Sequence, residues 1–448
     1  MSEEYLKVSN LSVSKNLYDF INNEALPNSG ISSNQFWRGL SSSLEILVPI
    51  NKKLLDDRRK LQLEIDRWHL NNNKNTFDLD GYETFLKKIG YLKKEGPDFK
   101  IKTKNLDEEI SNIPGPQLVV PISNSRYALN AVNARYQSLY DSLYGTDVIQ
   151  TEESASERYD PERGLEVIKY SKRFLDKFFT LKKKSWKDVI EIKIINKDLY
   201  LDTYKIKDQL KEPDKFIGYR GAKEKPTAII LKNNNLHVEI IINPSAFSAK
   251  SDPAGISDII VEAAITTICD HEDSVAGVDA EDKINGYKNW LGLMKGDLKS
   301  KFEKKGKSYI RKLNPDRKFV KKDGSLSKLH GRALLLNRNV GHLMTNPCIL
   351  LKDGSEIPEG ILDAFVTSLC SMHDLKLKKN SRTGSIMIVK PKQHGPEECS
   401  FTNLIFEKVE EVLRLETVSY THLRAHETPE HRVCRRRGVK KKGGGGGG

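Results

Sequence analysis

VEAAITTICDHED, from Val261 to Asp273, is an apolar run that ends in acidic residues. Three other apolar runs end in polar groups in the same way: Leu118–Ile122, followed by Ser-Asn-Ser-Arg; GRALLLNRNVGH, Gly331 to His342; and GSIMIVKPKQHGPEE, Gly384 to Glu398. Nearly continuous apolar runs are typical of parallel strands, which are buried on both faces. Polar groups that follow such strands are typical of the mouth of an α/β barrel.

Four such strands with helical segments between them predict an α/β fold. We expect a TIM-type (β/α)8 barrel of which about the first four strands are present, formed by residues 113–134, 265–295 and 332–413. A doubly wound sheet would give similar runs. It would more often carry a Gly-rich phosphate turn after its first strand, and none is found here.

Two further units are expected around the barrel. Residues 1–92 form an N-terminal helical clasp, because apolar residues recur at helical spacing after Ser32 as far as Pro49, which should interrupt the helix. Residues 135–264 and 296–331 form an inserted α/β domain. In it, AIILKNNNLHVEIII predicts two strands joined at Asn233–Asn235.

Composition limits the class of protein. A chain of 448 residues with 38% apolar content is long enough for two to three globular domains. It contains no apolar run long enough to span a membrane, and its first residues lack the pattern of a secretory signal, so we expect a cytoplasmic protein. The five cysteines show no C-x-x-C spacing, which favours reduced thiols over a disulfide framework or a zinc ribbon.

The net charge of +13 raises the question of a nucleic-acid partner. Much of the excess lies in residues 414–448, which hold nine Lys and Arg residues against three Glu. The lysines of the remaining chain are dispersed, a pattern typical of a solvated surface. We therefore expect neither a nucleic-acid nor a membrane partner.

The acidic residues after Ile268 suggest a site. Side chains alternate along a strand, so we expect Asp270 and Glu272 to share one face and Cys269, His271 and Asp273 to share the other. Two carboxylates at a barrel mouth suit the surroundings of a divalent cation or an ordered-water network. Cys269 and His271 lack a second pair of ligands at zinc spacing, so packing against the outer helices is favoured for them.

The body of the chain resembles the malate synthase G family, from about Ile113 and more loosely from the N-terminus to Leu413. The resemblance is carried by LVVPISNSRYALNAVNARYQSLYDSLYGTD, LKNNNLHVEIII, KSDPAGISDIIVEAAITTICDHEDSVAGVDAEDK, YKNWLGLMKGDL, RKLNPDR, RNVGHLMTN, EIPEGILDAFVTSL and NSRTGSIMIVKPKQHGPEE. It implies a Mg2+-dependent acyltransferase of the glyoxylate bypass. Such an enzyme condenses acetyl-CoA with glyoxylate and hydrolyses the thioester to malate and CoA, usually as a monomer.

The resemblance also implies roles for single residues. Arg338 matches the catalytic arginine that holds glyoxylate and the enolate oxygen, a task suited to a permanently charged planar group. Its alternative is a structural ion pair at a strand end. Asp270 and Glu272 match acids that hold the waters of the metal. The acetyl-CoA site maps onto Val119, Arg126, Tyr127, Ser274 and Arg311. No chemistry is assigned to His342 or His394.

The sequence departs from the family after Leu413. The family's next strand carries a metal-binding Glu in a segment like GIMDEERRT, and a metal-binding Asp and the base Asp follow; we expect these beyond Leu413 and do not find them. Residues 414–448 therefore predict a non-native tail. Its Lys-Lys-Lys followed by six Gly is what a run of A nucleotides and then a run of G nucleotides would encode. An artefact is therefore favoured over a zinc site at His422, His426, His431 and Cys434.

Three functional alternatives remain open. The gene encodes a malate synthase, of which this chain is the N-terminal part. Alternatively, the chain is an inactive fragment that retains at most weak acetyl-CoA binding, since half a barrel exposes strand edges and should fold poorly. A barrel lyase acting on other CoA esters, such as citramalyl-CoA, is the third alternative.

Overall fold

A four-stranded parallel sheet lies at the centre of the computed structural model, which describes residues 4–72, 77–94, 96–98, 103–150, 159–304 and 306–415. Its order is β20 (Ile388–Val389), β17 (Leu334–Arg338), β12 (Thr266–Asp270) and β3 (Gln117–Pro121). Asp270 stands in register with Pro121 on one side and with Arg338 on the other. The four runs predicted as parallel strands are thus neighbours, and their C-terminal ends form one edge of a partial barrel.

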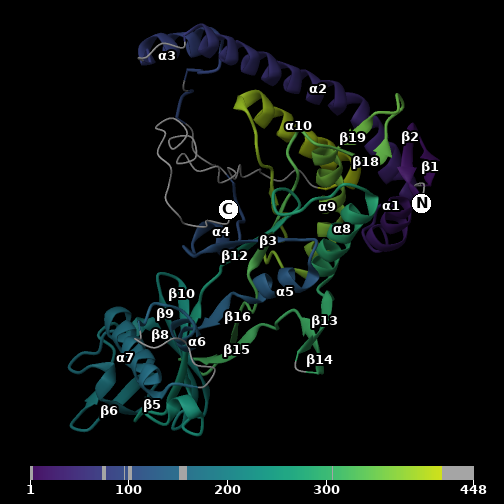
Figure 1. Cartoon of the computed structure of the whole chain (residues 1–448). Coiled ribbons are helices and arrows are strands. Elements are labelled where there is room, and N and C mark those ends of the chain that lie inside the picture. The colour runs from purple at the N-terminus through teal and green to yellow at the C-terminus, as the bar shows by residue number, and fades with distance from the viewer. Residues whose placement is uncertain are drawn as a thin grey trace.

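Helices that follow each of these strands in the chain pack beside the sheet (Figure 1). They are α5 (Ser125–Asn133), α8 (Ala280–Lys295), α9 (Glu359–Leu377) and α10 (Gly395–Leu413). Asn124 caps α5 by accepting hydrogen bonds from two backbone N–H groups, and Asp279 caps α8 through the N–H of Asp282. Apolar side chains of these helices form one core with the N-terminal segment.

The N-terminal segment contains α1 (Lys15–Phe20), a π-helical turn at Ile21–Ala25, α2 (Ser33–Asn71) and α3 (Leu79–Lys88). The predicted interruption at Pro49 is wrong, because α2 runs through this proline. Its buried side chains all lie between Phe36 and Asn51, where the helix packs on α10. Tertiary packing of this first half thus outweighs the hydrogen bond that proline removes. Figure 1 shows the second half extending beyond the body to α3.

A seven-stranded antiparallel sheet forms the lower part of the molecule in Figure 1. Its order is β16 (Leu326–Leu329), β15 (Arg317–Lys321), β8 (Phe216–Gly221), β9 (Pro226–Asn233), β10 (Leu236–Ile242), β11 (Ile256–Glu262) and β4 (Tyr136–Ser138). The predicted hairpin is present, with Asn234 and Asn235 at φ of 49° and 63° in the turn. Asparagine suits this position because it tolerates the left-handed region.

The remaining elements complete these layers. They are β1 (Tyr5–Val8), β2 (Leu11–Ser14), β18 (Thr345–Leu350) and β19 (Glu356–Pro358) in one sheet; β5 (Val189–Ile195), β6 (Asp198–Thr203) and β7 (Lys207–Asp208) in another; the hairpin β13 (Lys299–Lys304) and β14 (Lys307–Lys312); α4 (Glu108–Ser111), α6 (Leu139–Tyr144) and α7 (Pro161–Phe178); and 3-10 turns at Trp186–Asp188, Pro213–Lys215 and Phe247–Ala249. Within the described ranges, no helix combines the length and apolar character needed to cross a bilayer.

Candidate functional site

Arg338 and Asp270 form the centre of the site, at the C-terminal ends of β17 and β12. Arg338 donates from Nε to Oδ1 of Asp270 at 2.7 Å and from Nη2 to Oδ2 at 2.8 Å. The pair is bidentate because the two residues are in register on adjacent parallel strands and point to the same side. The side chain of Arg338 keeps 15% exposure, whereas that of Asp270 has none. One edge of the guanidinium is therefore fixed, and the group still reaches the surface of the mouth.

Asp270 also organises the turn that follows it. Its oxygens accept the backbone N–H groups of Glu272 and Ser274 and the hydroxyl of Ser274, at 2.7 to 3.0 Å. Burial alone would raise the pKa of Asp270, but the hydrogen bonds from Arg338 and Ser274 outweigh it and hold the pKa below its ordinary value. Asp270 therefore stays ionised. In turn it raises the pKa of Arg338, which keeps a permanent positive charge at the mouth.

Glu272 is held differently from Asp270. Its Oε2 accepts the backbone N–H of Gly341 at 2.6 Å, and its Oε1 accepts from Lys392 at 2.6 Å. Lys392 also binds Asp273 at 2.5 Å, so Glu272 and Asp273 converge on one ammonium group. The expected alternation of these two residues across a strand is therefore wrong. The strand ends at Asp270, so side chains after this residue no longer alternate between two faces.

Cys269 and His271 pack away from the mouth, as favoured from the sequence. Cys269 is fully buried in the main core, and the ring of His271 lies 5.4 Å from that of Tyr287 on α8. Burial lowers the pKa of His271 to about 4, so the ring is neutral at pH 7. The side chains of both residues stay away from the guanidinium of Arg338, although the backbone N–H of His271 donates to the carbonyl of Arg338 at 2.9 Å.

Two arginines expected at the acetyl-CoA site meet on one aromatic ring. The guanidinium carbon of Arg126, on α5, lies 5.0 Å from the ring centre of Phe302, and that of Arg311, on β14, lies 5.6 Å from the same centre. Tyr309 stacks on Phe302 at 5.6 Å. Both arginines are exposed. The hairpin β13–β14 therefore brings two distant cations together at the surface beside α5.

The other residues assigned to acetyl-CoA are less closely grouped. Val119 on β3 and Tyr127 on α5 are 37% and 53% exposed, and Ser274 is exposed at the turn after β12. Within the described residues, no hydrogen bond or ring contact links Val119 or Tyr127 to Arg311. Their exposure leaves them accessible to a ligand. The structure alone does not assemble them into one pocket.

The sequence interpretation missed Phe302 and Lys392. Phe302 belongs to KSKFEK, in which an aromatic residue between lysines was a signal that could have been noticed. Lys392 follows the fourth predicted strand. The sequence indicates that this strand ends in polar residues, but it does not single out Lys392 among them. Neither contact could be inferred from sequence spacing, because each joins segments that are distant in the chain.

The carboxylates of the mouth are candidate metal ligands. In the described part of the chain, no three His, Cys, Asp or Glu side chains gather as a metal site. The oxygens of Asp270 and Glu272 already accept hydrogen bonds from Arg338, Ser274, Gly341 and Lys392. These two acids therefore do not fit a first coordination shell. The histidines and the cysteine of the tail, which were weighed as a zinc site, lie outside the described residues.

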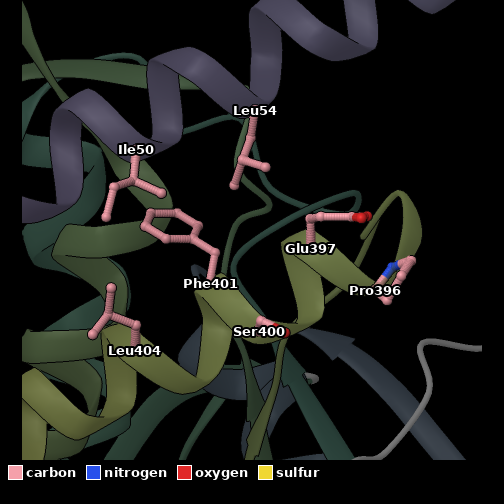
Figure 2. A pocket seen from close by; sticks show the side chains of 7 residues that line it. All are labelled: Ile50, Leu54, Pro396, Glu397, Ser400, Phe401 and Leu404. Carbon is pink, nitrogen blue, oxygen red and sulfur yellow. The ribbon is translucent and has the colours of Figure 1, made fainter.

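A pocket of about 390 Å³ lies elsewhere, between α2 and α10. Figure 2 shows Ile50 and Leu54 of α2 facing Phe401, with Leu404 farther along α10 and Glu397 near its start. Glu397 pairs with Lys93. The lining is mostly apolar and lies apart from Arg338, so this pocket reflects helix packing and adds no polar group to the candidate site.

Comparisons with known proteins give matches in three parts of the chain. Family models match at residues 16–78 (malate synthase, N-terminal domain), 159–233 (malate synthase G, alpha-beta insertion domain) and 334–428 (malate synthase, TIM barrel domain). The last match runs past Leu413 into residues that the structure does not describe.

Three relatives with the name malate synthase G cover most of this chain. Those from Halalkalibacterium halodurans and Corynebacterium efficiens are 47% identical to it, and that from Corynebacterium glutamicum is 46% identical. Each alignment covers 92% of this chain but only 56 to 58% of the relative. The chain therefore spans little more than half the length of these proteins.

Proposed function

The chain belongs to the malate synthase G family, and from this membership we propose that it supplies the glyoxylate-binding arginine and part of the CoA-binding surface of a malate synthase. The reaction joins the methyl carbon of acetyl-CoA, after loss of one proton, to the aldehyde carbon of glyoxylate. Water then cleaves the thioester and releases malate and CoA. The observation that carries the proposal is the bidentate Arg338–Asp270 pair at the aligned strand ends.

Arg338 is proposed to bind glyoxylate and to stabilise the enolate oxygen. Its Nε and Nη2 are committed to Asp270, so the guanidinium cannot rotate, and its remaining edge is available for an oxyanion. A donor fixed before the reaction stabilises developing charge without a reorganisation cost. Asp270 is the positioning residue, because it keeps this cation in place and does not itself need to touch substrate.

Arg126 and Arg311 are proposed to bind the phosphates of CoA. Two guanidiniums on the ring of Phe302 give a concentrated positive charge at an exposed surface, and arginine pairs well with phosphate oxygens. Val119, Tyr127 and Ser274 would border the remaining part of the acyl-CoA.

Mg2+ remains the proposed cofactor on the family resemblance, where it supplies charge stabilisation for the enolate. Asp270 and Glu272 do not fit as its direct ligands, for the reason given above. The direct ligands and the base are those that the resemblance places after Leu413. No step of the proposal depends on the geometry of this ion.

The test is glyoxylate-dependent release of CoA from acetyl-CoA, followed with a thiol reagent in the presence of Mg2+. In a chain that carries the ligands and base expected after Leu413, we expect Arg338→Gln to reduce this rate at least 100-fold, while the control Arg382→Gln, which removes a distant Asp316 pair, retains it. Acetyl-CoA binding without CoA release would favour the fragment alternative. Cleavage of citramalyl-CoA without condensation would favour the lyase.

A further inference from the structure

The backbone directly after Arg338 is held by three charged side chains. The N–H of Val340 donates to Oδ2 of Asp363 at 2.9 Å, and the carbonyl of Val340 accepts from Nζ of Lys390 at 2.6 Å. The next N–H, that of Gly341, donates to Glu272 at 2.6 Å. Three successive polar groups of one loop thus each have a charged partner from a different segment of the chain.

Lys390 is deeply buried in this arrangement. Lys390 comes directly after β20 in the chain, and the residue is only 6% exposed. Besides Val340, its ammonium binds the carbonyl of Gly360 at 2.7 Å. Burial lowers the pKa of Lys390 to about 8, with Asp363 and Glu272 acting in the opposite direction. A buried ammonium is costly, and Lys390 donates to two carbonyl groups without a direct carboxylate partner, so burial of apolar surface does not explain its position.

Asp363 anchors the other side of the loop. It is fully buried on α9, and its Oδ1 accepts from Nζ of Lys283 and from the hydroxyl of Tyr287, both at 2.6 Å. Lys283 also pairs with Glu359 at 2.9 Å. Oδ2 of Asp363 is thereby oriented towards the N–H of Val340. The loop after β17 is consequently tied to both α8 and α9.

Gly360, near the start of α9, supplies an independent observation. A Cβ atom there would lie within 2.6 Å of the carbonyl oxygens of Val340 and Gly341 and of Nζ of Lys390. Real Cβ atoms do not make such contacts, so the helix can approach the loop this closely only through a glycine. The close approach is what brings the carbonyls of Val340 and Gly360 to one ammonium group.

We propose that Lys390, together with Asp363, is a positioning residue that clamps the Val340–Gly341 peptide, and that this clamp sets Glu272 and Arg338 at the mouth. The role of Arg338 in this statement rests on the proposed function. The clamp itself does not rest on the proposed function, because it concerns only how firmly residues 339–342 are held. If Lys390 served only global stability, its removal would weaken the whole fold without loosening residues 339–342 in particular.

Amide hydrogen exchange, read by mass spectrometry over peptides that cover residues 339–342, tests the clamp. Lys390→Met keeps an unbranched side chain that is one atom shorter, and it removes both hydrogen bonds. The matched control is Lys172→Met, because Lys172 is also buried, has a lowered pKa and pairs with Asp252 in the inserted domain. We expect exchange at 339–342 to become about tenfold faster in Lys390→Met and to stay unchanged in Lys172→Met.

The second measurement is the dissociation constant of glyoxylate, determined by calorimetry in the presence of Mg2+. We expect it to rise about tenfold in Lys390→Met relative to Lys172→Met. Unchanged exchange at 339–342 in folded Lys390→Met overturns the clamp. Faster exchange with unaltered glyoxylate affinity supports the clamp but overturns the statement that it sets Arg338 at the mouth. If Lys390→Met does not fold, as judged by circular dichroism, the same comparison is made with Lys390→Gln. If even the unaltered chain does not bind glyoxylate, the proposed function fails, and exchange alone decides the clamp.

Discussion

Asp270 binds Arg338 through two hydrogen bonds of 2.7 and 2.8 Å, and the two residues face each other in register across adjacent parallel strands. This relationship joins the two most informative motifs of the sequence. The acid had been assigned to the surroundings of a metal. In the structure its contacts are with the arginine and with Ser274. Asp270 therefore fixes the guanidinium of Arg338 at the strand ends, which supports the positioning role proposed for it.

The first prediction concerns Asp270→Asn. An amide cannot neutralise Arg338, so a partly buried guanidinium would lose its hydrogen-bonded counter-charge and keep only weaker ones, such as the exposed Asp273 at 3.8 Å. We expect the free energy of unfolding to fall by about 3 kcal/mol in urea titrations, and glyoxylate-dependent CoA release to fall at least 100-fold in a chain that carries the ligands and base expected after Leu413. The control is Asp273→Asn, since Asp273 is exposed and 3.8 Å from Arg338. Equal effects of the two substitutions would contradict a special role for the bidentate pair.

The second prediction concerns Phe302→Ala, which removes the ring shared by Arg126 and Arg311. Both arginines should become more mobile, and we expect the dissociation constant of acetyl-CoA to rise about tenfold with little change in stability. Phe247→Ala is the control, because Phe247 is an exposed ring near a cation, Lys250, in another part of the chain. Unchanged acetyl-CoA affinity in Phe302→Ala would contradict the proposed role of this surface in binding CoA.

The third prediction is a dependence of stability on pH through His342. Burial, followed by Lys390 and Arg58, lowers its pKa to about 3. The unfolded chain takes up this proton near pH 6.5 and the folded chain only near pH 3, so stability must fall as the pH decreases through this window. From pH 7 to pH 5 we expect the wild type to lose about 2 kcal/mol more than His342→Gln. Parallel stability curves for the two proteins would refute this assignment.

The fourth prediction concerns Gly360→Ala. The added methyl group must displace the carbonyls of Val340 and Gly341, which are backbone atoms and cannot rotate away. We expect a loss of about 1 to 3 kcal/mol in the free energy of unfolding, measured by urea titration. Gly96→Ala serves as the control, because no atom lies within 4 Å of the corresponding position. A neutral Gly360→Ala would show that α9 does not hold the loop closely.

The sequence by itself determined the local elements and the family. Apolar runs with polar ends predicted the four parallel strands, and the strong turn preference of Asn-Asn predicted the β9–β10 hairpin. These features follow from side-chain periodicity and backbone preference, which act over a few residues and are therefore visible in the chain.

Only the tertiary structure decided the contacts of the site. Glu272 turns to Lys392 and Gly341 because the strand ends before it. Phe302 joins Arg126 to Arg311, and Lys390 holds the loop after Arg338 through carbonyl groups. Such contacts link segments from distant parts of the chain. Their geometry depends on how closely helices and strands pack, which the spacing of residues along one segment does not specify.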